Sequence, residues 1–159
     1  MRDGLPNGVS ARVWIYLGAA IFLVALLLSA IAVPELRLLH FLQALIYVAV
    51  IVLARRNSAW GFGAGFAIAV IWNAMGLFVT HLIQAGAADF WLWLRGGHVA
   101  EFVPMMVTLG GLGHFILIFG ALLAVVRGNS ERRKWWKFAG GGAAAIAYFA
   151  LIVAFSQPH

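Results

Sequence analysis

The sequence has 159 residues, of which 64% are hydrophobic and 10% are charged. A soluble globular domain is about half apolar and about a quarter charged, and a disordered chain is less apolar still, so this composition excludes both and indicates a bilayer-embedded protein. The net charge of +6 does not indicate nucleic-acid binding, because the basic residues stand at the ends of apolar stretches.

Five apolar stretches predict an all-α membrane bundle that forms a single transmembrane domain. Each is near the length that a helix needs to cross a hydrocarbon core of about 30 Å. The first is interpreted as a retained span, because no signal-peptidase-like site follows it. The stretches are continuous, whereas barrel strands would alternate in hydropathy. In chain order they are residues 13–33, 36–54, 60–84, 102–126 and 136–155.

The basic residues gather at one end of this predicted bundle. If the N-terminus is cytoplasmic, the opposite side keeps only Arg37 and Arg95. The positive-inside rule therefore predicts a cytoplasmic N-terminus and an outer C-terminus, as in a bacterial inner-membrane protein. The nine of eleven basic residues on the cytoplasmic side are Arg2, Arg12, Arg55, Arg56, Arg127, Arg132, Arg133, Lys134 and Lys137.

The connection at residues 85–100, between the third and fourth stretches, has an unusual composition. Its segment DFWLWLR at residues 89–95 is too short to span the membrane and too aromatic for a free loop. Indole rings favour the headgroup level, so we predict an interfacial segment there. It is either a plain membrane anchor or a lid over an outward-facing cavity.

A layer of polar side chains is predicted inside the bundle. At about 1.5 Å of rise per residue, polar groups from all five stretches fall about 18–24 Å from the cytoplasmic end. Polar groups are costly in hydrocarbon and usually face the bundle interior. Besides Ser29, this layer contains the five residues that we predict to line a cavity or bind a cofactor: His40, Gln43, Asn73, His114 and Tyr148.

Two functional hypotheses follow from this layer. In the first, a cavity around His40, Asn73 and His114 binds or translocates a small solute or protons. In the second, His40 and His114 are the axial ligands of a b-type haem, or one histidine holds a chlorophyll-type pigment. The glycines at residues 109–113 (LGGLG) would leave room for the macrocycle beside His114.

A third hypothesis gives the protein a structural role. The histidines would then only form hydrogen bonds between helices, and glycine-rich faces would pack against other copies or a larger membrane complex. Small residues let helices approach closely in lipid. In the fifth stretch, Gly141 and Ala145 stand four residues apart and predict a close approach of another helix.

A weaker prediction concerns the outer rim. His98 and Glu101 are three residues apart, and His81 would supply a third ligand to a metal ion. The alternative is a solvated rim without a metal. The chain has no cysteine, which excludes thiolate metal sites and CxxC haem attachment. No hydrolase, Walker or dinucleotide motif is present, and these absences favour a non-enzymatic protein.

Overall fold

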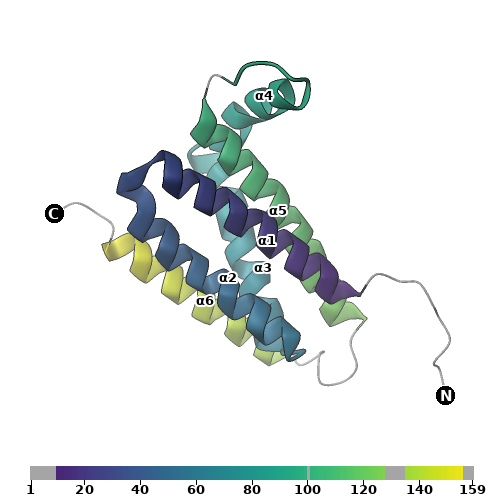
Figure 1. The fold of residues 1–159 in the computed structure, drawn as a ribbon. Helices are drawn as coiled ribbons and strands as arrows, with labels where there is room; N and C mark the ends of the chain where they lie inside the picture. The colour runs from purple at the N-terminus through teal and green to yellow at the C-terminus, as the bar shows by residue number, and fades with distance from the viewer. Residues whose placement is uncertain (1–9, 100, 128–134, 156–159) are drawn as a thin grey trace.

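The computed structural model describes residues 10–99, 101–127 and 135–155 (Figure 1). Within these ranges the chain forms helices and turns without a strand, which confirms the all-α prediction. Its helices are α1 (Ala11–Ala32), α2 (Arg37–Arg55), α3 (Ala59–Ala74), α4 (Leu82–Leu94), α5 (Phe102–Val126) and α6 (Trp135–Phe155).

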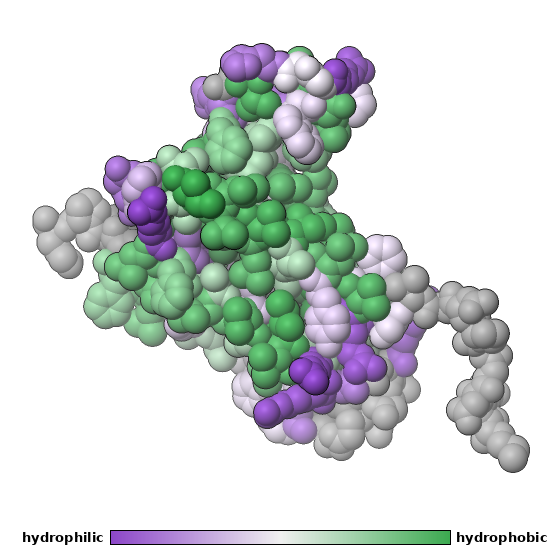
Figure 2. Space-filling model, viewed as in Figure 1, coloured by the Kyte–Doolittle hydropathy of each residue, from purple (hydrophilic) through white to green (hydrophobic). Residues whose placement is uncertain are grey.

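Five helical segments in the described ranges are long and apolar enough to cross a membrane. The protein is therefore an integral membrane protein in its architecture. On the face seen in Figure 2, the middle of the bundle is apolar and hydrophilic residues gather at its ends. The membrane orientation predicted from the charges stays a prediction. The five segments are Ala11–Ala32, Pro34–Arg55, Ala59–Val79, Phe102–Val126 and Trp135–Phe155.

The third span ends five residues earlier than the sequence predicted. After α3 the chain continues as a π-helical segment, Met75–Val79, and the Thr80 N–H donates to the Met75 carbonyl at 2.9 Å. His81 then adopts a left-handed conformation with φ of 55°. A non-glycine residue in this region breaks a right-handed helix. Residues 82–84 therefore belong to α4, and the predicted loop at 85–100 is mostly helical.

Helix α4 packs across the first half of α5. A methyl group on Gly86 would overlap the Pro104 carbonyl, so only glycine permits this approach. The Thr108 hydroxyl donates to the Ile83 carbonyl at 2.9 Å. The predicted location of this segment at the headgroup level remains a prediction.

Two pairs of helices form the tightest interfaces of the bundle, α1 with α5 and α3 with α6. A methyl group on Gly18 of α1 would lie 2.5 Å from the Gly113 carbonyl oxygen of α5. A methyl group on Gly141 of α6 would overlap the Trp60 carbonyl, and Ala145 is buried one turn later. The close contact predicted at Gly141 and Ala145 is therefore confirmed.

Helix α2 completes the bundle by packing on α1 and α3. Its buried face carries Gln43, Ile46, Tyr47 and Val50. It meets α6 at far fewer points, although the two helices run side by side (Figure 1). The bundle therefore has its packed interior between α1, α2, α3 and α5, and a more open seam between α2 and α6.

Candidate functional site

His114 lies at the centre of a hydrogen-bond network that joins α2, α3 and α5. Its Nε2 is 2.6 Å from the Tyr47 hydroxyl, and its Nδ1 is 3.1 Å from Asn73 Oδ1. The Asn73 amide nitrogen donates to the Gly111 carbonyl at 3.3 Å. All three side chains are at most 4% exposed. The network therefore lies wholly inside the bundle.

The partners of His114 determine where its proton lies. Asn73 uses its N–H groups on the Gly111 side, so its Oδ1 accepts a hydrogen bond from His114 Nδ1–H. A neutral imidazole carries one N–H, and Nε2 therefore accepts from the Tyr47 hydroxyl. Both ring nitrogens are satisfied, in a region where an unpartnered polar group is costly.

The ring of Phe22 on α1 packs against one side of this network. Its ring stacks on His114, with centroids 4.1 Å apart, and lies 4.3 Å from the Tyr47 ring centroid. A methyl group on Gly110 would be 3.0 Å from the Phe22 ring, and one on Gly111 would be 3.5 Å from Asn73 Oδ1. Gly110 thus leaves room for Phe22, which fills the space that sequence analysis gave to a macrocycle.

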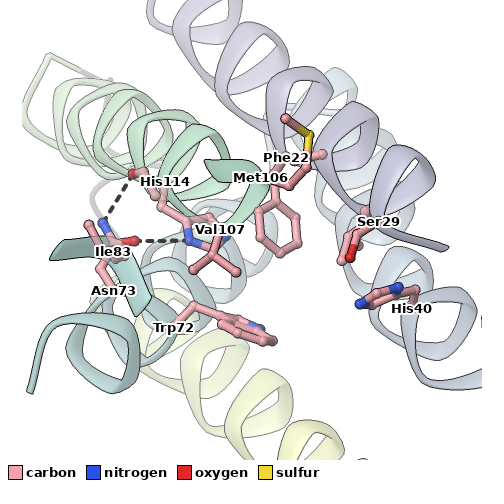
Figure 3. A pocket seen from close by; sticks show the side chains of 12 residues that line it. Phe22, Ser29, His40, Trp72, Asn73, Ile83, Met106, Val107 and His114 are labelled. Carbon is pink, nitrogen blue, oxygen red and sulfur yellow. Dashed lines mark hydrogen bonds between the residues drawn. The ribbon is translucent and has the colours of Figure 1, made fainter. Parts of the chain in front are cut away.

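A cavity of about 50 Å³ lies beside this network, between α1, α2, α3 and α5 (Figure 3). Ser29, His40, Asn73 and His114 line it together with Trp72. The structure therefore brings together four of the six polar residues that the sequence placed at one level. The other lining residues are apolar or glycine: Phe22, Ala25, Leu26, Ile83, Met106, Val107 and Gly111.

Two polar atoms of the residues that line the cavity lack a partner. His40 Nδ1 and Trp72 Nε1 are buried, and neither has a hydrogen-bonding partner among the described residues. Buried polar atoms are nearly always bonded to protein or to ordered water. The hydrogen-bonding capacity of these two atoms is therefore unused within the described part of the chain.

The remaining two predicted residues lie elsewhere. Gln43 is buried on α2 but does not line the cavity, and its Oε1 has no partner in the described part of the chain. The Tyr148 hydroxyl donates to the Leu42 carbonyl at 3.0 Å, which ties α6 to α2. Sequence analysis missed Tyr47, although it stands four residues after Gln43 and so shares its helical face.

The predicted metal site at the outer rim is not assembled. Among the residues that the structure describes, no three His, Asp or Glu side chains come together as a metal site requires. Helix α5 begins at Phe102, after His98 and Glu101, so their three-residue spacing does not place them on one helical face. The Glu101 N–H instead donates to Asp89 Oδ2 at 3.1 Å.

No protein-family model, no curated protein and no solved structure matches this chain. A function must therefore be inferred from the cavity, its lining residues and their hydrogen bonds.

Proposed function

We propose that this membrane protein binds a small uncharged polar solute in the cavity between α1, α2, α3 and α5 and carries it across the bilayer. The observation that carries the proposal is the pair of unpartnered atoms, His40 Nδ1 and Trp72 Nε1. Leaving a buried polar group unpartnered costs about 1–3 kcal/mol. A solute that bonds to both atoms would remove this cost when it binds.

The size and charge of the cavity define the class of solute. A water molecule needs roughly 10–15 Å³ of such space, so about 50 Å³ holds a few waters or a molecule of a few heavy atoms. None of the described residues that line the cavity is Asp, Glu, Lys or Arg. An ion would find no counter-charge there, which favours a neutral solute.

A solute fits the His114 network better than a proton relay does. A relay needs groups that accept a proton on one side and release it on the other. The Asn73 amide accepts from His114 but does not pass a proton on, so the chain from Tyr47 ends there. We therefore assign His114 to holding the cavity wall in place and His40 to contacting the solute.

One side of the cavity is lined by Ile83 of α4. Its Cδ1 lies against Gly76 and Gly111, at 2.7 Å and 3.1 Å from the positions that a methyl group on each would take. The absence of side chains on Gly76 and Gly111 lets Ile83 pack closely against both helices. We propose that α4 is the lid, and that the turn at Thr80 and His81 is where it moves.

Solute permeability of proteoliposomes tests the proposal. Stopped-flow light scattering would follow the entry of urea, glycerol and ammonia, with protein-free liposomes as the baseline. We expect faster entry of at least one solute with the wild-type protein. His40→Leu keeps the side-chain volume but removes Nδ1, and we expect the protein-dependent rate to fall about fivefold, the worth of one hydrogen bond.

His98→Leu is the matched control, because it removes an exposed histidine that does not line the cavity. Its permeability should equal that of the wild type. The proposal fails if wild-type liposomes behave like protein-free ones, or if His40→Leu changes nothing.

A haem ligated by His40 and His114 is less well supported. His114 would have to give up its bond to Tyr47 or to Asn73, and a macrocycle exceeds a cavity of about 50 Å³. The absorption spectrum of the detergent-purified protein distinguishes the two functions. A visible band that disappears in His114→Ala would replace the solute proposal with the haem one.

A further inference from the structure

A groove of about 310 Å³ runs along the seam between α2 and α6, with α3 as its floor. Leu45, Ala49 and Leu53 form one wall, and Ala144 and Tyr148 belong to the other. The groove is apolar apart from the Tyr148 hydroxyl, which already donates to Leu42. It is separate from the cavity of the proposed function, since no residue lines both.

One end of this groove is basic. Arg56 follows Leu53 by three residues and Ala49 by seven, so it continues the α2 wall at the end of that helix. Lys137 precedes Gly141 by four residues and continues the α6 wall in the same way. Figure 2 shows a hydrophilic surface at this end of the bundle. An apolar slot therefore leads to a pair of cations, one on each wall.

Aromatic side chains mark the same end. Trp60 lies on the groove floor, and its ring makes an edge contact with Trp136 at 6.2 Å. Lys137 Nζ lies 5.5 Å from the Trp136 ring centroid. Indole rings favour the headgroup level of a bilayer. The groove thus runs from the headgroup level, at Arg56 and Lys137, into the hydrocarbon.

We propose that this groove binds one anionic phospholipid, with an acyl chain along α3 and the headgroup phosphate between Arg56 and Lys137. An acyl chain matches the apolar lining, and basic pockets between transmembrane helices attract anionic headgroups. A zwitterionic lipid offers the same chains but cancels its phosphate charge. The site therefore selects by headgroup charge.

A second copy of the chain is a poorer occupant. One turn of a helix about 10 Å wide takes up roughly 400 Å³, more than the groove provides. A two-fold dimer in a membrane also keeps both copies in the same orientation. Pairing through this groove would bring Arg56 and Lys137 of the two copies to the same end, where like charges repel.

Native mass spectrometry of the full-length protein in detergent tests the site. Phosphatidylglycerol and phosphatidylcholine with identical acyl chains would be titrated separately. We expect one tightly held phosphatidylglycerol and weaker retention of phosphatidylcholine. The double variant R56Q/K137Q should weaken phosphatidylglycerol binding about thirtyfold, because each cation alone contributes about fivefold.

Three further variants separate the groove from its surroundings. Ala144→Leu changes an exposed residue, fills the groove and leaves all charges intact, and it should also weaken phosphatidylglycerol binding. Its control is Ala150→Leu, which changes an exposed alanine outside the groove and should leave phosphatidylglycerol binding unchanged. Arg127→Gln removes an arginine at the end of α5, outside the groove, and should leave binding unchanged. Thermal unfolding of every variant verifies that it is folded, and Ala49→Leu replaces Ala144→Leu if the latter is not.

Several results would overturn this site. Equal loss in Arg127→Gln and R56Q/K137Q would mean that the whole basic end attracts the lipid. Unchanged binding in a folded Ala144→Leu or Ala49→Leu protein would mean that the groove is not occupied. A lipid-free dimer that Ala144→Leu dissociates would assign the groove to a second copy.

Discussion

The two histidines beside the cavity differ in burial and in hydrogen bonding, although the sequence places them at a similar depth in the membrane. His114 is 1% exposed and bonded through both ring nitrogens, to Tyr47 and Asn73. His40 is half-buried, and its Nδ1 has no partner within the described chain. Figure 3 shows them on opposite sides of the cavity. The bonded His114 joins three helices, whereas the unpartnered Nδ1 of His40 is an atom that we propose contacts a solute.

This contrast predicts the largest loss of stability at His114. His114→Ala would leave the Tyr47 hydroxyl and Asn73 Oδ1 unpartnered and open a void against Phe22. We expect the free energy of unfolding to fall by about 3 kcal/mol, from the void and the lost interhelical bonds together. Unfolding in mixed micelles with increasing dodecyl sulfate would measure it. His98→Ala, an exposed histidine, should change little; an equal loss there would contradict the assignment.

A smaller loss is expected from Tyr47→Phe. The phenylalanine ring keeps the packing on Phe22 but removes the donor to His114 Nε2. Interhelical hydrogen bonds in membrane proteins are worth about 0.6 kcal/mol on average and about 1.7 at most. We expect Tyr47→Phe to lower the free energy of unfolding by about 1 kcal/mol in the same unfolding assay. Tyr148→Phe also removes a hydroxyl, but from a half-buried site, and should lower the free energy of unfolding by less. A larger loss of stability in Tyr148→Phe than in Tyr47→Phe would argue against a central role for His114.

The smallest effect on stability is expected at His40. His40→Leu removes a ring nitrogen that has no partner to lose, so the free energy of unfolding should change by less than about 0.5 kcal/mol. The same variant should lose solute permeability. A destabilisation comparable to that of His114→Ala would show that the two histidines do not differ in role.

The spans were predictable because long apolar helices have a strong signal in the sequence. Four of the five predicted spans agree with the structure to within about two residues. The third did not end where expected, because the π-helical segment and the positive φ of His81 interrupt it without a proline or glycine at residues 80–84. Leu82 and Ile83 within this stretch led the sequence analysis to extend the span to Gln84.

The candidate site was predicted only in part. Depth along each helix identified His40, Asn73 and His114, since all three had to face the interior. Depth alone could not find Tyr47, which stands seven residues, about 10 Å, from His40 along α2. Tyr47 nevertheless reaches from α2 to His114 on α5 inside the bundle. Nor could a sequence show that Phe22 fills the space beside the glycines.

The π-helical segment Met75–Val79 stands between Asn73, which bonds His114, and Ile83, which lines the cavity. A π turn contains one more residue than an α turn, and each residue rotates a helix by about 100°. Deleting one residue here would restore regular winding but swing Ile83 off Gly76 and Gly111. The orientation of Ile83 relative to Asn73 therefore depends on a single inserted residue. A one-residue deletion in this segment would move Ile83 relative to Asn73 without changing either residue.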